Sequence, residues 1–205
     1  MGVAMADTLA PHLVGESIVA LLRARRALLV QGGQLAGVPA TADIAHVPVA
    51  KLASATPPSA GLSLTCFHLT RADQVRPMAS AAAPGAIGLS LELHYLLACW
   101  EGTAADELSL MAWAMLELNR FPVLGAGHLV GTGWTRGESV QLVQGGETPE
   151  QLARIWDSFK LKARLSAVYR ARTVHIGYGS AGEGLPVVAS RLSFADGDVA
   201  MEPAS

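Results

Sequence analysis

The side chains able to bind a metal or attack a substrate are spread along the chain without a recognised catalytic or metal-binding spacing. Six histidines stand at positions 12, 46, 68, 94, 128 and 175, and no two of them are four residues apart. Neither Cys66 nor Cys99 has a second thiol or a histidine at zinc-ligand spacing. His68, His94 and His175 would form a metal site only if neighbouring strands brought them together, and ordinary strand histidines are the favoured alternative. We therefore expect no metal centre and interpret both cysteines as buried thiols.

Two glycine-rich segments have the composition of nucleotide or nucleophile loops, but their contexts do not fit. The chain contains no Gly-x-x-x-x-Gly-Lys-Ser/Thr sequence, which excludes a phosphate-binding P-loop. Gly125-x-Gly127 follows a predicted helix, whereas a dinucleotide loop follows a strand. The sequence around Ser180 has Tyr178 where a nucleophile elbow requires glycine, and Pro186 disfavours the helix that should follow. We expect no cofactor and no catalytic residue.

The composition favours a folded protein that contacts other proteins. Of the 205 residues, 51% are hydrophobic and 16% are charged, and the net charge is −2. Such an apolar chain is not intrinsically disordered, and its balanced charge is not that of a nucleic-acid-binding domain. Since average soluble domains are about 25% charged, the low charge suggests that another subunit covers part of the surface.

The sequence predicts neither a secretory signal nor a membrane span. Asp7 precedes every lysine and arginine, and the uncharged stretch between Arg76 and Glu92 is interrupted by prolines and glycines. We therefore expect a cytoplasmic protein without direct membrane insertion.

Hydrophobic periodicity predicts three helices. They cover Thr8 to Val30, Thr103 to Arg120, and the ten or so residues after the capping box that begins at Thr148. The middle of the second helix, Leu110 to Leu116, is apolar on every side, so the N-terminal helix, a loop or a second copy must cover its other side. We assign Trp113, in this stretch, to a partner interface.

Four longer strands and one short edge strand are expected between these helices. The predicted strands are Gly61–Thr70, Leu89–Leu97, Glu138–Val143 and Arg164–Ile176, with the edge strand inside Ile44–Lys51. Arg76 to Gly88 is expected to be a long loop. This order predicts an α/β (α+β) domain, residues 1–176, in which about three helices lie mainly on one face of a mixed sheet. Residues 177–205 form a Gly-rich tail in which Val187 to Leu192 could add an edge strand.

Two arginines on the last strand provide a second interface hypothesis. Strand alternation places Arg170 and Arg172 on one face with Val168, Val174 and Ile176. Like charges about 7 Å apart repel each other. The aliphatic parts of the two side chains could lie on apolar surface with the guanidinium groups in solvent, or the guanidinium groups could pair with carboxylates of a partner. The second alternative assigns both arginines to a partner interface.

Four segments, taken in order, resemble one known family. They are Leu89 to Leu97, Asn119-Arg120-Phe121-Pro122-Val123-Leu124, Glu150 to Trp156, and Arg164 to Tyr169. Together they resemble the N-terminal domain of the cap, or tail-terminator, proteins of extracellular phage-tail-like contractile injection systems. The resemblance covers roughly Leu9 to Ile176, and its specificity lies in the ordered set.

The resemblance implies a structural role without substrate or cofactor. Members of this family form a six-fold ring on the last layer of the inner tube and tie that tube to the surrounding sheath. The resemblance also implies that the chain forms a homo-hexamer with tube and sheath proteins as its partners. It implies a location in the bacterial cytoplasm, within a particle that is either released from the cell or retained. The residues themselves leave two alternatives to this structural role. One is a small α/β enzyme that uses the loop near His128 with Ser180, and the other is a ligand-binding module.

Overall fold

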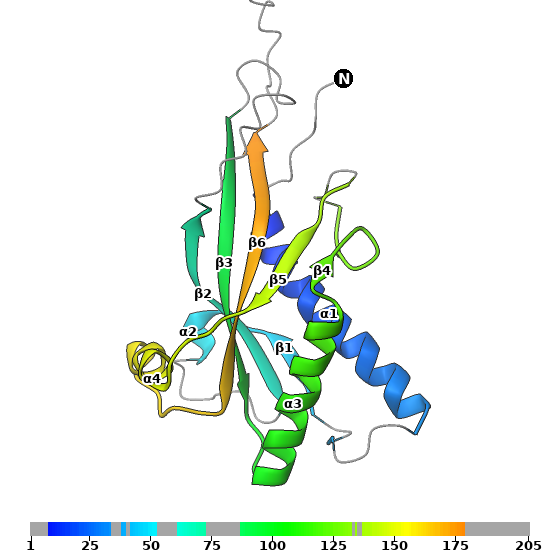
Figure 1. Ribbon diagram of the computed structural model, residues 1–205, viewed down its shortest axis with the longest axis vertical. Helices are drawn as coiled ribbons and strands as arrows, with labels where there is room; N and C mark the ends of the chain where they lie inside the picture. The colour runs from blue at the N-terminus through cyan, green and yellow to red at the C-terminus, as the bar shows by residue number, and fades with distance from the viewer. Residues whose placement is uncertain are drawn as a thin grey trace, which may run out of the picture.

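The computed structural model describes residues 8–33, 38–39, 42–52, 61–72, 87–132, 134 and 137–178. They form a twisted six-stranded mixed sheet with the strand order β1-β2-β3-β6-β5-β4 (Figure 1). Only β1 and β2 pair in parallel; the other neighbours are antiparallel. The strands are β1 (Ile44–His46), β2 (Leu62–Arg71), β3 (Ile87–Cys99), β4 (Val123–Leu124), β5 (Val140–Gln144) and β6 (Ser166–Tyr178). The helices are α1 (Ala10–Gln31), α2 (Val49–Leu52), α3 (Ala104–Arg120) and α4 (Pro149–Ser158).

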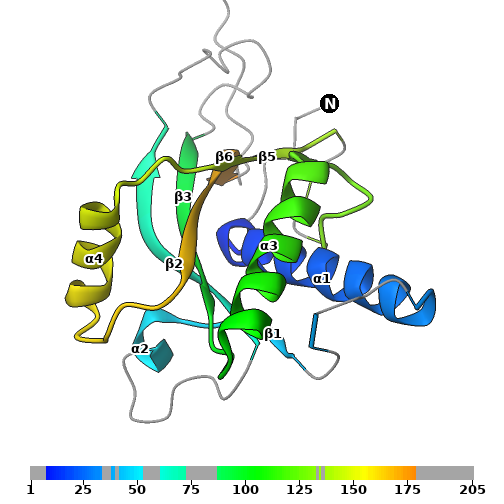
Figure 2. The ribbon, with the colours of Figure 1, turned by 60° about the horizontal axis from the view of Figure 1, so that its bottom comes forward.

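The predicted α/β (α+β) class with a mixed sheet is confirmed, and the helices divide between the two faces of the sheet (Figure 2). The long helices α1 and α3 cover one face, where Leu93, Tyr95 and Leu97 of β3 are fully buried. The short helices α2 and α4 cover the other face. The predicted arrangement has the helices mainly on one face. Leu96 and Ala98, which alternate with the three residues above, are also apolar, so the second face needs helices that cover it.

Local signals position the helices as predicted. Thr103 caps α3 by accepting a hydrogen bond from the Asp106 amide at 3.2 Å, and α3 ends just before Pro122. Thr148 and Gln151 form the expected capping box at the start of α4. These contacts satisfy amides that have no partner within the helix.

One side-chain assignment on β6 was wrong. Between the pairs Leu91–Val174 and Leu93–Ala171, β6 contains one residue more than β3, which is a β-bulge. The bulge reverses the alternation, so Val174 joins the core under α1 and α3 while Arg170 points to the opposite face. Arg170 and Arg172 therefore do not share a face with Val174 and Ile176.

Several elements differ from the predicted boundaries. The short strand β4 and the single-turn helix α2 were not predicted, whereas the edge strand β1 was. β3 begins at Ile87, inside the expected loop, whose residues 76–86 lie outside the described part of the chain. Residues 179–205 of the expected tail 177–205, which include its expected strand at Val187 to Leu192, also lie outside it, so the domain boundary stays a prediction. Among the described helices, none has the combination of length and apolar sequence that crossing a bilayer requires.

Candidate docking surface and ligand sites

Helix α3 has apolar side chains on two sides, and the described part of the chain covers one of them. Leu110 and Ala114 are fully buried against the sheet and α1. Leu108 and Leu116 are 60% and 66% exposed, with exposed Ala112 between them. Residues 108, 112 and 116 are spaced by four, so they lie along one side of the helix. We call these three residues the outer row.

The second half of α1 is similarly uncovered. The last buried residue of this helix is Leu22, and beyond it Leu28 and Val30 are 57% and 46% exposed. Figures 1 and 2 show this end of α1 projecting past the sheet. We call residues 23–31 the α1 extension. Clusters of exposed large apolar side chains are typical of surfaces that bind another protein.

A buried ion pair joins the α1 extension to α3. The Arg25 Nε donates to Glu117 Oε2 at 2.8 Å, and both side chains are largely buried. The same guanidinium lies 5.8 Å from the centre of the Phe121 ring. These contacts connect the α1 extension to α3, the helix that carries the outer row.

Trp113 lies on the inner side of α3. It is 8% exposed and is part of the protein's own core, and its indole N–H has no hydrogen-bond partner among the described residues. The outer row therefore offers more apolar surface to a partner than Trp113 does. The assignment of Trp113 to an interface stays a prediction.

Arg170 and Arg172 pair with carboxylates of their own chain. Arg170 Nη2 donates to Glu147 Oε1 at 2.9 Å, and this bond raises the pKa of the Arg170 guanidinium. Arg172 Nε donates to Glu92 Oε2 at 3.0 Å. Neither of the two expected arrangements included these internal partners. A contact of either arginine with another chain stays a prediction.

The three strand histidines are only partly brought together. His68 and His94 are opposite each other on β2 and β3, with ring centres 5.2 Å apart. His94 also lies 3.2 Å from Glu92, and burial is the main cause of its lowered pKa. His175 is in register with Ser90, four residues from His94 along β3, and its side chain lies outside the described part.

A different group of potential metal ligands forms where α1 meets β1. His12, Glu16 and His46 each offer one ligand atom, and these atoms lie within 4.8 Å of one another. Sequence reasoning missed this group because its three donors match neither a helical histidine pair, nor a cysteine spacing, nor the set of strand histidines. The available signal was the spacing of four between His12 and Glu16, which places them on one side of α1.

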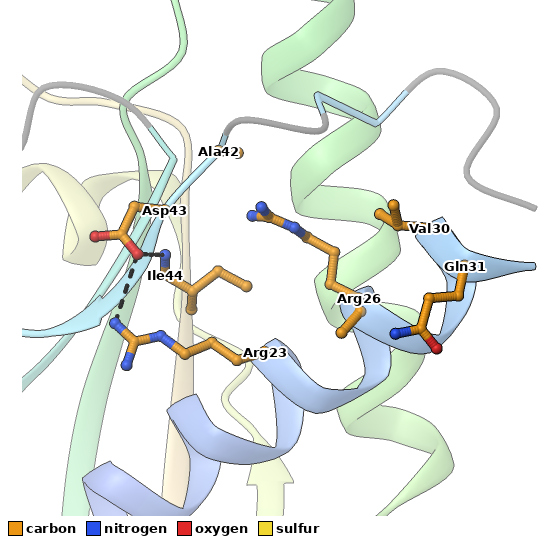
Figure 3. A pocket seen from close by; sticks show the side chains of 8 residues that line it. Arg23, Arg26, Val30, Gln31, Ala42, Asp43 and Ile44 are labelled. Atoms are coloured by element: carbon orange, nitrogen blue, oxygen red, sulfur yellow. Dashed lines mark hydrogen bonds and ion pairs between the residues drawn. The ribbon is translucent and has the colours of Figure 1, made fainter. Parts of the chain in front are cut away.

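An open cavity of about 430 Å³ lies between the α1 extension and the start of β1 (Figure 3). Arg23 and Arg26 line it from the helix, and Asp43 lines it from the segment before β1. Arg23 Nη2 and Asp43 Oδ1 are 3.5 Å apart, and the same carboxylate accepts a hydrogen bond from the Ile44 amide. The cavity adds polar groups beside the exposed apolar side chains, which is the usual composition of an interface rim.

The residues considered for catalysis do not form a described site. Both cysteines are free thiols, and burial is the main cause of the raised pKa of Cys66 and of Cys99. A raised pKa keeps a thiol in its unreactive protonated form. His128 packs against the Phe121 ring with centres 5.3 Å apart, and Ser180 lies outside the described residues.

The elements and their packing define a small α+β domain in which large apolar side chains are exposed on α3 and on the α1 extension. More specifically, the chain belongs to the Pvc16 N-terminal domain family, whose model matches residues 13–189. This membership confirms the resemblance found in the sequence. No curated protein matches the chain.

The solved structures that are similar to this chain include two terminator or cap proteins. The first is the PVC sheath/tube terminator of an extracellular contractile injection system, in its extended state. It is 18% identical and has a TM-score of 0.54 over 92% of this chain and 64% of that chain, which shows the same fold. The second is the anti-feeding prophage tube-terminating cap, 17% identical with a TM-score of 0.46, over 66% of this chain and 50% of that one. The match thus covers less than two thirds of the first terminator's length.

Proposed function

We propose that this chain is a structural, non-enzymatic cap of a contractile injection system that ends the inner tube and anchors it to the sheath. The observation that carries the proposal is the shared fold, over 92% of this chain, with a protein described as a sheath/tube terminator. Membership of the Pvc16 N-terminal domain family supports the same role.

In this proposal, copies of the chain form a ring, and six copies match a six-fold tube. A ring requires each copy to present a surface that binds the next copy. The outer row and the α1 extension are suited to this contact because their large apolar side chains are exposed in the single chain. We assign a second copy of this chain to that surface.

The remaining surfaces would face tube and sheath proteins of the same particle. The ends of β3 and β6 project beyond the helices (Figure 1) and would offer one such surface. Growth of the tube stops because this ring offers no further tube-binding face. The cap acts in the bacterial cytoplasm, where the particle is assembled.

The experiment that tests this function uses preformed tube ends. Purified protein is mixed with tubes of the same particle, with and without sheath, and the ends are viewed by electron microscopy. The proposal predicts a ring of extra density at one end and no addition of tube subunits to capped ends. A variant with Leu108→Glu and Leu116→Glu is the matched control and should not cap. Absence of any density on tube ends, with wild-type protein in excess, would refute the proposal.

A further inference from the structure

We propose that His12, Glu16 and His46 bind a divalent transition-metal ion of the zinc class where α1 meets the edge strand β1. Glu16 Oε1 lies 3.0 Å from His46 Nδ1 and 3.9 Å from His12 Nε2. The two imidazole rings are stacked with centres 5.3 Å apart. Three donor side chains thus converge on one small volume.

The fold places each donor for an identifiable reason. His12 and Glu16 are one helical turn apart in the first half of α1. His46 ends β1, which is held in parallel register with β2 by the pair His46–Leu64. Its ring lies over Gly15, where an added Cβ would overlap the His46 ring. The glycine therefore leaves the space that the His46 ring occupies.

The distances suit an ion after a small movement of one side chain. Zinc bonds to histidine nitrogen at about 2.0–2.1 Å and to carboxylate oxygen at about 2.0–2.2 Å, so tetrahedral ligands lie roughly 3.3 Å apart. The Glu16–His46 separation is already close to this value. The side chain of His46 is 12% exposed and held in place, whereas that of His12 is 61% exposed and free to close onto the ion.

The donor types select the class of metal. Two imidazole nitrogens with one carboxylate oxygen match three-ligand zinc sites in which water fills the fourth position. Imidazole is a poor ligand for magnesium and calcium, which prefer oxygen. A bound ion would link α1 to the edge of the sheet and would stabilise the folded chain by binding it in preference to the unfolded one.

His12 distinguishes a metal site from an ordinary hydrogen bond. A bond between Glu16 and His46 alone would need no third donor. Zinc binding should therefore depend on His12, whose exposed side chain can be removed with little effect on folding.

The test uses full-length protein without a polyhistidine tag, stripped of metal with a chelator and titrated with zinc chloride. We expect one zinc per chain by calorimetry, no heat with magnesium at the same concentrations, and a rise in melting temperature with zinc. His12→Ala and Glu16→Gln should each weaken zinc binding by at least about tenfold. His68→Ala, which removes an exposed histidine from a neighbouring strand pair, should bind like the wild type.

Three results would overturn the proposal. The first is a wild-type protein that binds no zinc at concentrations up to the solubility limit of the titration. The second is a His12→Ala variant, folded by circular dichroism, that binds zinc as tightly as the wild type. An equal loss in His68→Ala would assign the zinc to β2 and β3 and would likewise overturn it.

Discussion

Large apolar side chains are buried around α4 but exposed on the outer row and the α1 extension. We call the buried group of Trp100, Trp156 and Phe159 the α4 corner. At α4, Trp156 is 1% exposed and packs against the rings of Trp100 and Phe159, each with centres 6.2 Å away. Its indole donates to Ser166 Oγ at 3.0 Å. On α3, Leu116 is 66% exposed and has no such cover. The first region completes its own packing, whereas the second leaves large apolar side chains exposed.

The difference follows from the sequences of the two helices. α4 has ten residues, and its large apolar residues lie in one stripe that faces the sheet. α3 has 17 residues with leucines on both sides, and a single sheet can cover only one of them. Stability should therefore depend mainly on the α4 corner and on the core, and association should depend on the outer row.

The largest expected effect on stability is at the α4 corner. Trp156→Ala removes a fully buried ring and its hydrogen bond, so the free energy of unfolding should fall by ~3–5 kcal/mol. Urea denaturation of the variant measures this change. The matched control is Leu116→Ala, for which we expect less than about 0.5 kcal/mol. Equal losses in the two variants would contradict the contrast between the regions.

The next largest effect on stability concerns the ion pair between Arg25 and Glu117, which joins α1 to α3. Glu117→Gln replaces a buried carboxylate that accepts from Arg25, so the free energy of unfolding should fall by about 1–3 kcal/mol. Arg23→Gln, which breaks the exposed pair with Asp43, is the control and should cost less than about 1 kcal/mol. A Glu117→Gln variant as stable as the wild type would show that α1 and α3 are held together by packing alone.

A smaller effect is expected at the start of α4. Thr148→Ala removes the side chain that caps this helix, and the free energy of unfolding should fall by about 0.5–2 kcal/mol. Thermal unfolding of the variant beside Thr148→Ser, which keeps the hydroxyl, measures the contribution of the cap. If both variants melt together, the α4 corner does not depend on its capping box.

The features that could be predicted from sequence are those set by nearby residues. The capping box at Thr148 predicted α4, and the alternation from Leu89 to Leu97 predicted β3, because helix starts and strand faces depend on local spacing. The family resemblance came from segments of this kind taken in order.

The features that could not be predicted depend on the partner segment. The bulge in β6, which turns Arg170 away from Val174, exists only relative to β3. The internal partners of Arg170 and Arg172 are 23 and 80 residues away in sequence. His12 and His46 meet only because β1 lies against α1. A sequence shows which residues are available for such contacts but not which of them meet.

Charges on the outer row should have the smallest effect on the stability of the single chain and the largest effect on association between copies. Leu108→Glu with Leu116→Glu places charges on exposed positions, so the free energy of unfolding of the single chain should change by about 0.5 kcal/mol or less per site. The same charges would be buried without partners in a contact between copies, which should prevent that contact. Chemical denaturation and a mass measurement on one preparation separate the two effects.

Sedimentation velocity over a series of concentrations tests the central claim most directly, with wild-type protein and the Leu108→Glu, Leu116→Glu variant measured side by side. The account predicts that the wild type sediments as a closed oligomer, with six copies as the expected number, and that the folded variant sediments as a monomer. A wild type that stays monomeric at every concentration, or a variant that assembles like the wild type, would contradict the claim that the outer row docks onto a second copy.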